Sequence, residues 1–89
     1  MQFRQGDLLF CLESTLPRPA RPHPGPILAG GQQADEHLHL LDGPGQLYES
    51  GNFLYLEAEQ PTFVWHPEHH RLALPAGTFR VVRQRQYQP

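Results

Sequence analysis

The chain has 89 residues, with nine acidic residues, seven arginines and no lysine, and its formal net charge at neutral pH is −2. This length suits one domain with a modest core, and the acidic balance argues against a nucleic-acid-binding surface because phosphate binding needs a concentrated positive field. No apolar run approaches the roughly 20 residues of a membrane-spanning helix, and the first residues lack the apolar region of a secretion signal. We expect one cytoplasmic domain over residues 1–89.

Short apolar runs separated by turn residues predict β-strands along the whole chain. The first strand, 8–12, follows a polar turn at 5–7, and a proline-rich surface loop follows at 14–26, which holds five of the ten prolines. The later strands are predicted at 27–29, 36–40, 46–49, 53–57, 62–65, 71–74 and 78–84, with a hairpin turn at 50–52. No window has a sustained helical period. The sequence therefore predicts an all-β fold, a small barrel or sandwich of about six to eight short strands with little or no helix.

Five of the six histidines fall into two clusters, at 37–39 and 66–70. Alternation along the predicted strand 36–40 places His37 and His39 on one face, close enough for both rings to reach one metal ion. The second cluster adds His66, Glu68 and His69, and an imidazole or the carboxylate from it would complete a three-ligand site. We predict metal ligands at His37, His39, His66 and His69, with a divalent transition metal (zinc, nickel or iron) as cofactor and no organic cofactor.

Simpler roles for these residues remain open. Histidines beside turns are often only solvated polar residues, and Glu68 is expected to form a surface ion pair with Arg71. His70 is the weakest candidate of its cluster. No motif for a serine or cysteine nucleophile, a phosphate-binding loop or paired catalytic acids is present, which favours a non-enzymatic role and leaves catalytic residues unassigned.

Two other functions compete with metal binding. The first is a non-catalytic protein-interaction module that forms a homo-oligomer, suggested by the small core and by Tyr48, Tyr55, Trp65 and Tyr87, which we expect to be exposed. The second is nucleic-acid binding through the arginines at 80, 83 and 85 with Tyr87 as a stacking platform. Strand alternation separates Arg80 from the other two arginines, so this function is the less favoured of the two.

The stretches QGDLLF, DEHLHLLDG and HPEHHRLALPAGTFRVVRQRQYQP resemble a small bacterial and phage-borne family of uncharacterised proteins. The family pattern reads QGD, then GHxH, then HxEH, then LPxGxYxVxRQRxYxP. Glu36 stands where the family shows Gly, and Phe79 stands where it shows Tyr. The resemblance groups Gln5, Gly6 and Asp7 with the two histidine clusters and implies no known activity.

A weaker resemblance is to the cupins, which are small metal-binding β-barrels. Gly31 followed after five residues by His37-Leu38-His39 is similar to the first cupin motif, and the turn at 75–77 is similar to the second. Asp42 lies one or two positions before the place where the first cupin motif has Glu. Arg80 stands where the second motif usually has His. A cupin-like metalloenzyme would need its third ligand from His66 or His69.

Overall fold

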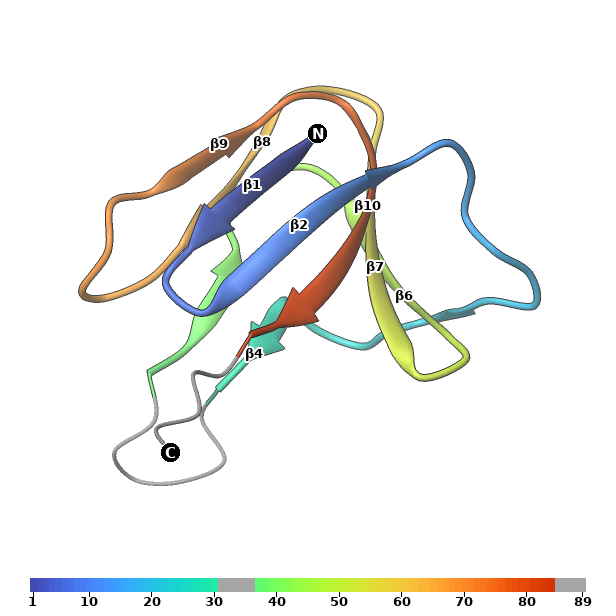
Figure 1. The fold of residues 1–89 in the computed structure, drawn as a ribbon, viewed down its shortest axis with the longest axis horizontal. Coiled ribbons are helices and arrows are strands. Elements are labelled where there is room, and N and C mark those ends of the chain that lie inside the picture. Colours follow the sequence, from blue (N-terminus) through green and yellow to red (C-terminus); the bar gives the residue numbers. More distant parts are fainter. Residues whose placement is uncertain (31–36, 85–89) are drawn as a thin grey trace.

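The structure is a computed structural model, and it describes residues 1–30 and 37–84. Within these ranges the chain forms ten short β-strands and no helix (Figure 1). None of the described residues therefore belongs to a helix able to cross a membrane. In chain order the strands are β1 (Gln2–Gln5), β2 (Leu8–Glu13), β3 (Arg21–Pro22), β4 (Ile27–Ala29), β5 (His39–Leu41), β6 (Gln46–Ser50), β7 (Phe53–Ala58), β8 (Thr62–Trp65), β9 (Leu72–Leu74) and β10 (Gly77–Arg83).

The strands form two antiparallel sheets. Six strands make the larger sheet in the order β1, β2, β10, β7, β6, β3, and four make the smaller one in the order β4, β5, β8, β9. Sequence neighbours pair directly in the hairpins β1–β2, β6–β7 and β8–β9, whereas β10 returns from the end of the chain to lie between β2 and β7. β2, near the start of the chain, and β10, near its end, are therefore side by side, as Figure 1 shows.

The hydrophobic core lies between the two sheets. The larger sheet contributes Phe10 and Phe79, both fully buried, and the smaller sheet contributes Val64 and Leu74. Successive side chains of a strand point to opposite faces, so each of these strands sends alternate residues into the core. Burying an aliphatic or aromatic side chain of this size contributes on the order of 1.5–3 kcal/mol.

The prediction of an all-β fold is confirmed, and so is the hairpin between β6 and β7. Ten strands are formed instead of about six to eight, and the two additional strands are β1 and β3. β3 is a two-residue strand inside the proline-rich segment, where it pairs with β6. Neither sheet closes on itself within the described residues, so the barrel alternative is wrong, and with it the cupin-like barrel.

The strand predicted over 36–40 is shorter than expected, because β5 begins at His39. Ala29 of β4 pairs with His39, and directly after this pair the backbones of Gly30 and His37 pass very close to each other. A Cβ on Gly30 would collide with the backbone carbonyl oxygen of His37. His37 thus lies outside the sheet and is exposed while His39 is buried, so the prediction that they share a strand face is wrong.

Replacing Gly30 with Ala should lower the free energy of unfolding by more than about 2 kcal/mol. Gly30 has a φ of +90°, a left-handed conformation that costs an alanine roughly 1–2 kcal/mol, and the collision with the His37 carbonyl adds to this. Gly25→Ala is the matched control, because Gly25 has a φ of +76° and no heavy atom within 4 Å of the added Cβ. Urea denaturation of both variants measures the difference, and equal losses would contradict the close approach at Gly30.

Candidate functional site

A buried glutamine holds the ring of His39 in place. The side-chain NH2 of Gln5 donates to the backbone carbonyls of Val64, at 2.9 Å, and His70, at 3.0 Å. Because both partners are acceptors, the amide nitrogen must face them, and the amide oxygen faces Nδ1 of His39 at 2.9 Å. An amide oxygen only accepts hydrogen bonds, so Nδ1 of His39 carries a proton.

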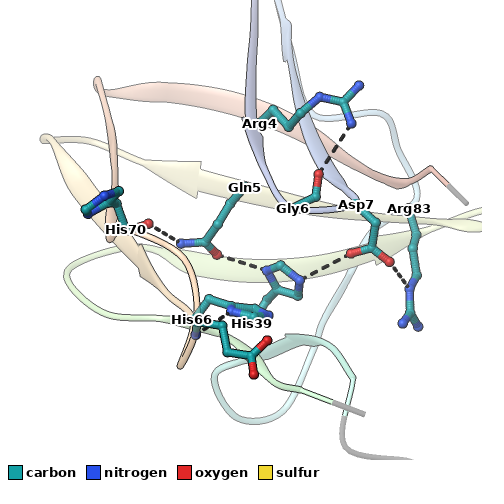
Figure 2. Close-up of polar contacts among 9 residues, drawn as sticks. Arg4, Gln5, Gly6, Asp7, His39, His66, His70 and Arg83 are labelled. Atoms are coloured by element: carbon teal, nitrogen blue, oxygen red, sulfur yellow. Dashed lines mark hydrogen bonds and ion pairs between the residues drawn. The ribbon is translucent and has the colours of Figure 1, made fainter. Parts of the chain in front are cut away.

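The opposite edge of the His39 ring faces Asp7. Nε2 of His39 lies 3.3 Å from Oδ1 of Asp7, and Oδ2 of the same carboxylate accepts a hydrogen bond from Nε of Arg83 at 3.0 Å. Figure 2 shows these residues in one line that runs from Gln5 through His39 and Asp7 to Arg83. The end of β10 is fixed here too, because the backbone N–H of Gln84 donates to the carbonyl of Asp7 at 2.7 Å.

The charges around His39 favour a neutral ring beside an ionised carboxylate. Burial lowers the pKa of His39, the neighbouring His66 lowers it further, and the opposing effect of Asp7 is not enough to restore the ordinary value of 6.5. Burial raises the pKa of Asp7, but the hydrogen bond and charge of Arg83 together with His39 bring it below its usual value. At neutral pH the Nε2 lone pair therefore faces a negative oxygen, at a separation longer than the usual N–H···O hydrogen bond.

His66 is also buried, but it carries its proton on the other nitrogen. Its Nδ1 accepts a hydrogen bond from the backbone N–H of Glu68 at 3.0 Å, so the neutral ring has its proton on Nε2. Burial lowers the pKa of His66, and the charges of His69 and His37 lower it further. The His39 and His66 rings, with centroids 4.5 Å apart, therefore form a pair with opposite tautomers.

Two exposed histidines complete the group. The ring of His69 lies 4.4 Å from that of His66, and the ring of His37 lies 5.7 Å from it. Nε2 of His37 is 3.4 Å from Oε1 of Glu68. The structure thus brings together the four histidines that the sequence singled out, from two segments far apart in the chain.

Gly6 provides the space that His69 occupies. A Cβ on Gly6 would stand 2.8 Å from Nε2 of His69 and 3.6 Å from Cε1 of His39. Gly6 also has a φ of +60°, which a residue with a side chain adopts only at a cost. The last residue of β1 and both residues of the following turn therefore act on the histidines: Gln5 and Asp7 contact His39, and Gly6 leaves room for His69.

Sequence reasoning missed Gln5, Asp7 and Arg83 as site residues, because only the fold places Gln5 and Asp7 against His39 and Arg83 against Asp7. The one signal was the resemblance that grouped Gln5, Gly6 and Asp7 with the histidines. The prediction of an ion pair between Glu68 and Arg71 is wrong. Glu68 instead contacts His37, and Arg71 forms its ion pair with a different carboxylate.

The guanidinium of Arg71 is paired with the Asp42 carboxylate at 3.1 Å and stacked on the ring of Phe63. Of the arginines considered for nucleic-acid binding, Arg83 contacts Asp7, and Nε of Arg80 lies 3.9 Å from a carboxylate oxygen of Glu13. The remaining two candidates, Arg85 and Tyr87, lie outside the described residues. The carboxylates beside Arg80 and Arg83 weaken the case for a phosphate-binding surface there.

Within residues 1–30 and 37–84, no three His, Cys, Asp or Glu side chains are already arranged as a group that could hold a metal ion. The site contains one close pair of atoms able to bind a metal ion, Nε2 of His39 and Oδ1 of Asp7. The His66 ring lies next to that of His39, and the His69 ring lies next to that of His66. His70 contributes its backbone carbonyl to Gln5, and its exposed ring takes no part in the ring contacts described above.

The sequence profile of a family described as a domain of unknown function, DUF8820, matches residues 4–84. The chain belongs to this family. The match covers the turn between β1 and β2, both histidine clusters and β10, so the whole candidate site lies within the family domain. No curated protein and no solved structure matches the chain.

Lowering the pH from 7.5 to 5.5 in a chelator-containing buffer should decrease the free energy of unfolding by an amount on the order of 1 kcal/mol. The pKa values of His39 and His66 are lowered in the folded protein. The unfolded chain therefore takes up protons first as the pH falls through 6.5, which favours unfolding. Urea denaturation at several pH values measures this slope.

His66→Asn should flatten that pH dependence. Asparagine keeps an acceptor for the Glu68 backbone N–H and removes the titrating ring. The groups that face His66 are His37, His39, His69, Glu68 and Asp7, and they remain in the variant. His70→Asn is the control and should keep the wild-type slope. A slope unaffected by the loss of His66 would contradict the assignment of a lowered pKa to this residue.

Proposed function

We propose that this protein is a small β-domain that binds a divalent transition-metal ion at its histidine cluster. The observation that carries the proposal is the separation of 3.3 Å between Nε2 of His39 and Oδ1 of Asp7. A lone pair and a carboxylate oxygen repel each other unless a cation or a hydrogen-bond donor lies between them. Imidazole and carboxylate together suit zinc, nickel and iron, the metals that the sequence suggested.

The neighbours of this donor pair support the same proposal. Metal-binding histidines usually donate their second ring N–H to a carbonyl or carboxylate, and metal-binding carboxylates are themselves hydrogen-bonded. Here the Gln5 amide oxygen accepts from His39 Nδ1, and Arg83 donates to the second oxygen of Asp7. Each donor is therefore already oriented by a partner that leaves its metal-binding atom available.

Domain size also favours a bound ion. A domain of 89 residues buries a smaller share of its surface than larger domains do, and metal binding adds its free energy to the folded state only. The cluster joins the turn between β1 and β2 in the larger sheet to β5 and β8 in the smaller one. An ion at this point would hold the two sheets together at one end of the core.

Isothermal titration calorimetry with Zn²⁺, Ni²⁺ and Fe²⁺ (the last without oxygen) tests the proposal. We expect binding of one ion per chain, weakened at least about 100-fold by His39→Asn or Asp7→Asn. Asparagine at position 39 can still donate to Gln5 but lacks Nε2, so the variant removes the ligand atom and keeps the orienting hydrogen bond. His70→Asn should bind like the wild type. Absence of binding, or equal binding by His39→Asn and His70→Asn, would reject the proposal.

A second candidate function is self-association through the outer face of the smaller sheet. Ile27 on β4, Leu40 on β5 and Trp65 on β8 are cross-strand neighbours in one row, and Ile27 and Trp65 are 45% and 41% exposed. Of the tyrosines expected to be exposed, Tyr55 is buried and Tyr48 is half-buried, whereas Tyr87 lies outside the described residues. An exposed apolar row of this kind is typical of an interface.

Multi-angle light scattering at micromolar concentrations measures this self-association directly. We expect a dimer for the wild type and a monomer for Trp65→Ser, because the substitution removes the largest apolar side chain of the row. Asn52→Ser, an exposed change in the turn between β6 and β7, should remain a dimer. A wild-type chain that is monomeric throughout this concentration range would reject the interface.

A further inference from the structure

The geometry points to tetrahedral coordination of Zn²⁺ by His39, Asp7 and His69, with His66 outside the coordination sphere. This inference rests on the proposed function and specifies it further: it names the geometry, the third ligand and the metal. Three protein ligands leave the fourth position of a tetrahedron for water, the arrangement of reactive rather than purely structural zinc sites.

The spacing of the donor pair is the first argument. With zinc to nitrogen and zinc to oxygen distances near 2.1 Å, two ligands at the tetrahedral angle lie roughly 3.4 Å apart. Ligands at the right angle of an octahedral or square-planar ion, at the same distance from the metal, lie roughly 3.0 Å apart. Nε2 of His39 and Oδ1 of Asp7 are 3.3 Å apart. Their separation is therefore closer to one edge of a tetrahedral site than to one edge of an octahedral or square-planar site.

The position of His69 supplies the second argument. Nε2 of His69 lies 2.8 Å from the point where a Cβ on Gly6 would stand. Cε1 of His39 lies 3.6 Å from the same point, and this carbon is bonded to Nε2 of His39. Gly6 precedes Asp7 in the chain, so the His69 ring packs against the same turn that carries Asp7. His69 is exposed, and coordination requires its side chain to turn toward the pair, because the described residues contain no ready group of three ligands.

His66 and His37 are excluded for different reasons. The proton of His66 is on Nε2, because Nδ1 accepts from the backbone N–H of Glu68. A metal ion would have to break that hydrogen bond or remove a second proton from the ring to use His66 as a ligand. Nε2 of His37 faces the Glu68 carboxylate, and the His37 ring neighbours that of His66, 5.7 Å away. Of the four histidines that the sequence suggested as ligands, this leaves His39 and His69.

Titration with Co²⁺, a common spectroscopic substitute for Zn²⁺, tests the inference. Tetrahedral Co²⁺ absorbs visible light strongly, whereas octahedral Co²⁺ absorbs it weakly. We expect a strong visible band that is displaced by Zn²⁺, with affinity at least about tenfold lower in His69→Asn. His66→Asn and His70→Asn should keep both the band and the affinity. Far-UV circular dichroism establishes that each variant is folded.

The outcomes separate the inference from the proposed function. Failure of Zn²⁺, Ni²⁺, Fe²⁺ and Co²⁺ alike to bind the wild type would overturn both, whereas failure of Zn²⁺ and Co²⁺ alone would overturn only the inference. Binding with only a weak visible band, or loss of the strong band in His66→Asn but not in His69→Asn, would overturn the tetrahedral site and leave metal binding intact.

A second measurement does not depend on any variant. Nitrogen-15 NMR of the histidine rings should show His39 protonated at Nδ1 and His66 at Nε2 before metal is added. Addition of Zn²⁺ should shift Nε2 of His39 and His69 strongly and leave the His66 ring in the same tautomer. A metal-bound shift at the His66 Nε2 would overturn the inference.

Discussion

The amide of Gln5 is the contact on which the site depends. Its nitrogen donates to two backbone carbonyls of the smaller sheet region, at Val64 and His70, and this leaves its oxygen in only one orientation, toward His39. One buried side chain thereby joins the two sheets and decides which nitrogen of His39 carries the proton. Loss of a buried hydrogen-bonding group costs about 1–3 kcal/mol for each partner left unsatisfied. The Gln5 amide therefore contributes to the stability of the fold and also fixes the tautomer of His39.

His39 and His66 have opposite tautomers, so the two rings present different groups to their surroundings. His39 presents a lone pair toward Asp7, and His66 presents an N–H because its Nδ1 is engaged by the Glu68 backbone. Histidine rings at similar distances from one another thus differ in what they can bind, and counting imidazoles does not give the ligand set. The arrangement of a donor pair, an orienting amide and an orienting arginine is the physical basis of the metal-binding proposal.

The small size of the fold gives this cluster a structural role as well. The core between the sheets consists of few residues, and the cluster lies where the turn between β1 and β2 meets β5 and β8. β10 ends at the same place, fixed by Arg83 and by the backbone N–H of Gln84 to Asp7. Changes in charge at the cluster therefore act on contacts between both sheets, and the proposed metal ion would couple binding to stability there.

The sequence by itself determined the all-β class, eight of the ten strands and the residue type on which the site is built. These follow from local signals, because period-two apolar patterns, glycine turns and clustered histidines are all read within a few residues. Only the tertiary structure decided that the clusters meet, that His37 leaves the sheet at Gly30 while His39 is buried, and that Gln5, Asp7 and Arg83 join the site. The clusters meet through the pairing of β5 with β8, and the position of His37 follows from the pairing of β4 with β5. Arg83 reaches Asp7 through the pairing of β2 with β10, which joins segments near opposite ends of the chain. Such contacts are fixed by the packing of the two sheets, and the local pattern of residues does not contain them.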